Sequence, residues 1–146
     1  MSTPNFASIL SEAPTEVTRT PPLPVGTYLC IVQPFELPKN ENGPARFPLK
    51  VMAPLDDVDI DALTESGGTE GKFLYYNVWP DERAREALDT IHAFAGLDLA
   101  DLADVSRAER NDMIVNGQVL AVVKHRTDKN DPTKVYAEVQ RIARAD

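Results

Sequence analysis

The sequence predicts a mainly β (α+β) protein with one or two helices, built as a five-stranded barrel. The order of its elements carries this prediction. Strand-like runs cover residues 27–32, 47–53 and 72–78, an amphipathic helix covers 82–95, and two further strand-like runs cover 118–126 and 135–142. One helix between the third and fourth of five strands is typical of an OB-like barrel, the small fold named for oligonucleotide and oligosaccharide binding.

The prolines divide the chain into an arm and one domain. Five of the twelve prolines lie within the first 24 residues, and proline fixes φ and donates no backbone hydrogen bond. We therefore expect residues 1–22 to form an extended, proline-rich arm and residues 23–146 to form the barrel. An apolar cluster in the arm, made of Phe6, Ile9 and Leu10, is interpreted either as part of a frayed terminus or as a docking peptide for a neighbouring subunit.

The first two strands are delimited by turn residues. Residues 24–26 form a turn that begins the first strand. Pro34 and Pro38 cannot donate to a strand ladder, so the strand either ends there or runs along an edge of the sheet. A loop over residues 39–44, rich in Asn and Gly, leads into the second strand. That strand has the two-residue period of a half-buried strand, with Phe47, Leu49 and Val51 on one face and Arg46, Pro48 and Lys50 on the other.

The helices are expected at three places. An acidic insertion near residues 55–70 is predicted to hold a short helix over 60–66 that ends at Gly67 and Gly68. Asp81 is predicted to cap the main helix, and Ser106 and Glu109 match a capping box that predicts another short helix. The apolar positions of the main helix recur at helical spacing: Ala84, Ala87, Leu88, Ile91, Phe94 and Ala95.

Charge and composition limit the kinds of partner that the protein is expected to bind. The net charge of −8 disfavours non-specific attraction to nucleic acid. Residues 118–146 nevertheless hold six basic and four acidic groups, so any nucleic-acid contact is expected from a local patch. The single Cys30 suits a reducing compartment. No apolar run approaches the roughly 20 residues of a membrane helix, so no membrane partner is expected. The N-terminus lacks a basic segment followed by an apolar stretch, so no secretory signal is expected.

The third strand carries the most informative side chains. If Leu74, Tyr76 and Val78 face the core, then Phe73, Tyr75 and Trp79 face outward, beside Arg46 and Lys50 of the second strand. Aromatic rings interleaved with cations hold single-stranded nucleic acids, and each stacked base contributes roughly 1–3 kcal/mol. The alternative is that both faces are buried, the second one under the acidic insertion or a partner subunit.

A second basic group flanks the last hairpin and consists of Lys124, His125, Arg126, Lys129 and Lys134. The loop between strands four and five borders the binding groove of OB-like barrels, so these residues are candidates for phosphate contacts. The alternative is a set of solvated hairpin charges, because Asp128 and Asp131 lie in the same loop.

Motifs for catalysis, metals and cofactors are not matched. Residues 57–61 resemble the start of a calcium loop, but the positions that require Gly and Glu hold Ala62 and Gly68. One cysteine and two histidines do not make a zinc pattern. The glycine-rich residues 67–71 lack the Lys-Ser/Thr of a phosphate-binding loop. We therefore expect no catalytic residue, no metal and no cofactor, and we predict that the protein is not an enzyme.

Several short motifs resemble a known family. They lie at residues 23–28, 71–74 with Asn77 and Trp79, 116–119, 123–126 and 135–139. With these motifs the chain resembles an uncharacterised family of small tailed-phage proteins described as single-stranded-DNA-binding-like, over roughly residues 23–142. The resemblance implies a bacteriophage origin, a five-stranded barrel and DNA binding. Unlike phage single-strand binders, this chain has no acidic C-terminal tail, so recruitment of replication enzymes through such a tail is not expected.

Two functions follow as hypotheses. The first is a non-enzymatic single-stranded-DNA-binding protein that works in the host bacterial cytoplasm during infection. Its bases would stack on Phe73, Tyr75 and Trp79, and its phosphates would contact Arg46, Lys50, Lys124, Arg126, Lys129 and Lys134. The second is a virion structural protein, a capsid decoration or cement subunit, whose arm contacts neighbouring subunits and whose acidity keeps it off packaged DNA. Homo-oligomer formation is compatible with both hypotheses.

Overall fold

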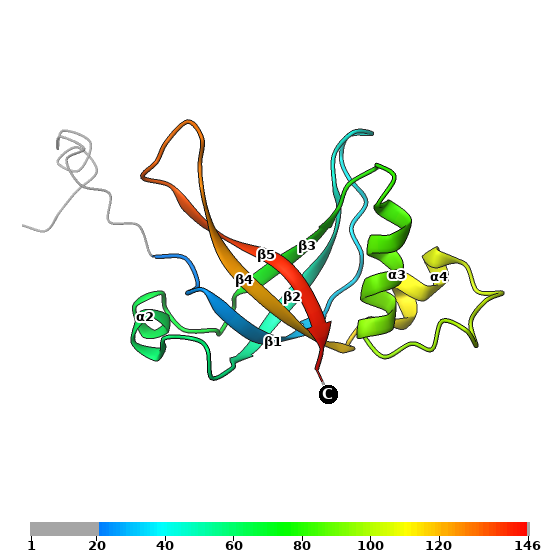
Figure 1. Cartoon of the computed structure of the whole chain (residues 1–146), viewed down its shortest axis with the longest axis horizontal. Helices are drawn as coiled ribbons and strands as arrows, with labels where there is room; N and C mark the ends of the chain where they lie inside the picture. Colours follow the sequence, from blue (N-terminus) through cyan, green and yellow to red (C-terminus); the bar gives the residue numbers. More distant parts are fainter. Residues whose placement is uncertain (1–20, 146) are drawn as a thin grey trace, which may run out of the picture.

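The computed structural model describes residues 21–145 of the chain (Figure 1). The apolar cluster of Phe6, Ile9 and Leu10, and nearly all of the expected arm, lie outside the described residues. The described strands are β1 (Gly26–Val32), β2 (Ala45–Pro54), β3 (Phe73–Val78), β4 (Gln118–Thr127) and β5 (Val135–Arg144). The helices in the same part of the chain are α2 (Ile60–Glu65), α3 (Ala84–Phe94) and α4 (Arg107–Met113).

The five strands form one antiparallel sheet that curls into a nearly closed barrel. Their spatial order is β3-β2-β1-β4-β5. The two end strands, β3 and β5, come together without backbone pairing (Figure 1). The helix α3 follows β3 in the chain and packs against β3, β5 and α4. The structure therefore confirms the predicted five-stranded OB-like barrel, with its helix between the third and fourth strands.

The inward faces of the strands form the core of the barrel. The largest fully buried side chains include Tyr28, Phe47, Leu49 and Ile91. The ring of Phe47 packs on Phe35, with 4.7 Å between ring centroids. The predicted apolar positions of α3 all pack on this core. None of the helices formed by residues 21–145 is long and apolar enough to cross a membrane.

The starts of α3 and α4 test two predicted caps. The Ser106 hydroxyl accepts a hydrogen bond from the Glu109 amide at 3.2 Å, which confirms the cap of α4. The prediction that Asp81 caps α3 is wrong. This helix begins at Ala84, two residues later than expected, and the Asp81 carboxylate instead accepts from the Arg83 amide at 2.8 Å. Asp81 thus closes a turn ahead of the helix, a local hydrogen bond that aspartate also makes readily.

The acidic insertion is anchored to the start of β1. The carboxylate of Asp57 accepts from the amide of Thr27 at 2.9 Å and from its hydroxyl at 2.8 Å. These hydrogen bonds hold the pKa of Asp57 below its usual range. A Cβ on Gly26, which has φ +145°, would lie 2.6 Å from Cγ2 of Val58, so the close approach of the insertion to β1 requires glycine there. The predicted short helix is present as α2.

A polar cluster joins α3 to α4. His92 is fully buried, and its Nε2 lies 2.6 Å from Oδ1 of Asn111. Because a carbonyl oxygen only accepts, Nε2 is the donor in this contact. Next to this pair, the Asp89 carboxylate accepts two hydrogen bonds from Arg107, at 3.0 and 3.2 Å, and lies 3.7 Å from Arg110. The hydrogen bond from Arg107 lowers the pKa of Asp89, and burial lowers the pKa of His92.

This cluster predicts a loss of stability in mild acid. The folded protein resists protonation of His92, whereas the unfolded chain takes up that proton below a pH of about 6.5. The midpoint of thermal unfolding should therefore fall as the pH drops below about 6.5. His92→Gln removes the titrating ring and should flatten this step. The control is His125→Gln, which changes the second histidine. Its Nε2 contacts the Leu23 carbonyl, so this change is expected to lower the midpoint but to keep the step. A step that survives in His92→Gln but not in His125→Gln would contradict the assignment.

Candidate nucleic-acid interface

The outward face of β3 presents aromatic side chains to solvent. Phe73, Tyr75 and Trp79 are 46%, 42% and 53% exposed, whereas Leu74 and Val78 of the inward face are buried. The predicted alternation of the two faces is thus confirmed. The alternative, in which the acidic insertion buries the second face, is wrong for this chain, because all three rings remain exposed.

The neighbouring strand β2 places cations beside these rings. In the antiparallel register, Arg46 lies opposite Asn77 and Lys50 opposite Phe73. Pro48 was expected to be exposed on this face, but it is buried. It lies opposite Tyr75 and beside the segment that follows β1, where its carbonyl accepts from the Gln33 amide at 2.9 Å. The alternation of residues along β2 cannot predict that a segment from elsewhere in the chain covers Pro48.

Arg46 is already engaged on this face. Its guanidinium carbon lies 4.7 Å from the centre of the Tyr75 ring, a cation–π contact. Its Nε donates to the Glu36 carboxylate at 3.0 Å. Arg46 therefore supports one face of the Tyr75 ring, and its charge is partly compensated before any phosphate arrives.

A first depression lies between this face and the segment that follows β1. We call it the loop hollow; its volume is about 410 Å³, and it is lined by Gln33, Pro34, Phe35, Glu36, Pro48, Phe73 and Tyr75. Its walls are rings and proline side chains. Such a lining accepts a flat, apolar group such as the face of a nucleobase.

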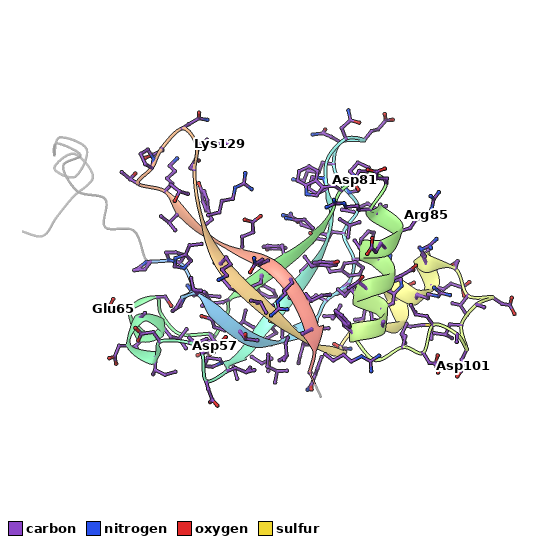
Figure 2. The ribbon with its side chains drawn as sticks, in the orientation of Figure 1. Asp57, Glu65, Asp81, Arg85, Asp101 and Lys129 are labelled. Atoms are coloured by element: carbon purple, nitrogen blue, oxygen red, sulfur yellow. The ribbon has the colours of Figure 1, made fainter. Side chains whose placement is uncertain are left out.

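A second depression lies between β3 and the β4–β5 hairpin. We call it the hairpin hollow; its volume is about 420 Å³ and its lining includes Asn77, Arg126, Lys129, Asn130, Tyr136 and Glu138. Arg126 lies opposite Tyr136 in the β4–β5 register, and it is 3.8 Å from the Glu138 carboxylate. Lys129 stands at the tip of the hairpin (Figure 2). This hollow is more polar than the loop hollow, and it still contains an exposed ring.

The two hollows are neighbours along β3. Tyr75 lines the first and Asn77 the second, and residues two apart on one face of a strand are separated by about 6.6 Å. Together they form a continuous outward surface that runs from Phe73 to the β4–β5 hairpin. We call this surface the binding face.

Some predicted residues do not join the binding face. Trp79 lies one residue beyond the end of β3, and it lines neither hollow. Lys134 lines a different depression, beside Pro21 and Pro22. Lys124 is exposed and lies opposite Glu138 in the strand register. Of the predicted cations, only Arg126 and Lys129 line either hollow.

Tyr136 was missed by the sequence-based prediction. It is 51% exposed and lines the hairpin hollow. The signal was present in the sequence, because Val135, Ala137 and Val139 alternate with Tyr136 and Glu138 over the last strand. Applying the same alternation that identified the β3 face would have placed this ring outward.

His125 also has a different role from the one expected. Its Nε2 lies 2.8 Å from the carbonyl oxygen of Leu23, a buried residue at the start of the described chain. The Tyr28 hydroxyl donates to the next carbonyl, that of Pro24, at 2.7 Å. These two contacts fix the entry segment to the barrel, so His125 acts in structure rather than as part of the basic group.

The described residues offer little for nucleophilic or metal chemistry. Burial raises the pKa of the Cys30 thiol to about 12, so the sulfur stays protonated at neutral pH. Between residues 21 and 145 there is no group of three or more His, Cys, Asp and Glu side chains placed to hold a metal ion.

Comparisons with known proteins do not identify a family for this chain. No family model matches the chain, and no curated protein matches it. Among solved structures, the chain is similar to yeast RPA bound to ssDNA, with a TM-score of 0.35, 9% sequence identity, and coverage of 99% of this chain and 89% of that chain. The strand order and the position of α3, rather than this similarity, define the protein as an OB-like barrel.

Proposed function

We propose that this protein binds single-stranded DNA on its binding face, without catalysing a reaction. One observation carries the proposal. Exposed rings from β3 and β5 line two adjacent hollows that lie between the segment after β1 and the β4–β5 hairpin. The spacing of about 6.6 Å between successive outward positions of β3 suits bases stacked on an extended strand.

The charges of the face support binding that is moderate in strength and sensitive to salt. Arg126 and Lys129 line the hairpin hollow, and Lys50 is exposed beside Phe73. Glu36 and Glu138 stand among these cations, so the surface is not uniformly basic. Stacking is therefore expected to supply a larger share of the affinity than phosphate contacts do, and the net charge of −8 limits binding elsewhere on the protein.

The test is a titration of a fluorescein-labelled 15-nucleotide single strand of mixed sequence, followed by anisotropy. We expect saturable binding at low salt that weakens as salt rises, because phosphate contacts release counterions. Lys129→Glu should weaken binding at least several-fold. Arg85→Glu is the matched control, because Arg85 is exposed on α3, away from the hairpin (Figure 2).

Two results would count against the proposal. One is an anisotropy that stays flat at micromolar protein and low salt. The other is an equal loss of affinity in Lys129→Glu and Arg85→Glu, which would mean that the DNA responds only to the total charge of the protein.

The bacteriophage origin and the virion alternative remain predictions. The docking residues of that alternative, Phe6, Ile9 and Leu10, lie outside the described residues, and no feature of residues 21–145 favours a capsid partner. A DNA titration that shows no binding would favour the virion alternative over DNA binding.

A further inference from the structure

The lining of the hairpin hollow contains a group that a sequence-neutral DNA binder does not need. Binding without sequence preference uses stacking and a positively charged groove. Here the Glu138 carboxylate lies in the same hollow as the Tyr136 ring, the Asn77 amide and the cation Arg126. Asp128 lines the same hollow. Because a carboxylate repels phosphate, the edge of a base fits beside Glu138 better than the backbone does.

The donors and acceptors around the hollow select among bases. An ionised carboxylate only accepts hydrogen bonds, and an asparagine amide both donates and accepts. Cytosine presents an exocyclic amino group, a donor, next to a ring nitrogen that accepts. Thymine presents a carbonyl oxygen in place of that amino group. With Glu138 at the exocyclic position and Asn77 at the ring nitrogen, the two side chains complement cytosine. In the same placement thymine puts its carbonyl oxygen against the Glu138 carboxylate and its ring N–H, a donor, against Asn77.

We propose that the hairpin hollow is a base-selective pocket, which takes a base that carries an amino group, and that Glu138 determines this preference. The inference rests on the proposed function and deepens it. Tyr136, which is 51% exposed, provides the ring on which the base stacks. Arg126 lies 3.8 Å from Glu138 and keeps that carboxylate at the hairpin edge of the pocket. Lys129 at the hairpin tip remains available for the adjoining phosphate (Figure 2).

The experiment compares the full chain on labelled dC15 and dT15 at pH 7.5 by anisotropy. One well-placed polar base contact discriminates by about tenfold, so we expect dC15 to bind about tenfold more tightly than dT15. Glu138→Ala should bring the ratio of the two dissociation constants close to one, mainly by lowering the dissociation constant for dT15.

A matched control separates base selection from simple charge. Asp101 is exposed in the segment between α3 and α4, outside both hollows and away from the hairpin (Figure 2). Asp101→Asn removes one negative charge, as Glu138→Ala does. It should change the affinities for dC15 and dT15 by the same factor and leave their ratio unchanged.

The outcomes are distinct. Equal affinities for dC15 and dT15 in the unmodified protein would overturn the pocket while leaving the proposed function intact. A ratio that survives in Glu138→Ala, or that falls equally in Asp101→Asn, would overturn the role of Glu138. Absence of binding to both oligonucleotides would overturn the proposed function itself.

Discussion

Phe47→Ala is expected to lower the free energy of unfolding by about 3–5 kcal/mol, the cost of removing a large buried aromatic side chain. The ring is fully buried on the inward face of β2, between Phe35 and Tyr76, with centroid distances of 4.7 and 6.3 Å. Its loss leaves a cavity that the two neighbouring rings cannot fill without leaving their own positions. Thermal unfolding followed by circular dichroism should show a midpoint about 10–20 °C lower.

The matched variant is Phe73→Ala, which removes the same side chain from the next strand. Because Phe73 is 46% exposed on the outward face, its removal should cost less than about 1 kcal/mol. The pair therefore tests which face of the sheet is the core. An equally large loss in Phe73→Ala would show that a partner subunit covers the outward face, and it would remove the basis of the binding face.

Loss of the two tyrosine rings of the binding face should produce the largest effect on DNA affinity. Tyr75 lines the loop hollow and Tyr136 the hairpin hollow. Each stacked base is worth roughly 1–3 kcal/mol, so Tyr75→Leu and Tyr136→Leu should each weaken binding by about tenfold or more. The double variant should weaken it by at least about a hundredfold in the anisotropy titration.

Conservative and distant variants make this result specific. Tyr75→Phe and Tyr136→Phe keep the rings and should retain most of the affinity. Ile60→Ala removes an exposed apolar side chain from α2, outside both hollows, and should leave binding unchanged. If leucine at positions 75 and 136 binds as well as tyrosine, the DNA is not stacked on these rings, and the proposed site is wrong.

The sequence predicts the fold here because each element shows a strong and local signal. The alternation of Leu74, Tyr76 and Val78 with Phe73 and Tyr75 determines which face of β3 is buried, and the structure agrees. The cap at Ser106 is equally local, since it depends on one hydroxyl and an amide three residues later. The predicted cap at Asp81 is wrong because an aspartate before a helix can close a turn just as well as it can cap the helix.

The composition of the site was harder to predict than the fold, because it depends on contacts between distant segments. Pro48 is buried by a segment that precedes it by more than ten residues. Lys134 and Arg126 flank the same hairpin but line different depressions. A count of charged residues also does not show which of them form ion pairs. In the sequence Arg46 counts as a free cation, but in the fold it contacts Glu36 and the ring of Tyr75. Register and pairing across strands decide these cases, and neither is visible in one segment alone.

The unpaired junction of β3 and β5 has a mechanical consequence. All four remaining pairs of neighbouring strands are joined by hydrogen bonds. The junction of β3 and β5 is therefore the line along which the barrel opens most easily. The hairpin hollow spans it, with Asn77 on one side and Tyr136 on the other. A strand of DNA bound to both residues would bridge the junction and hold β3 and β5 together. Binding and the rigidity of the barrel would then be linked, and the bound protein would resist opening more strongly than the free one.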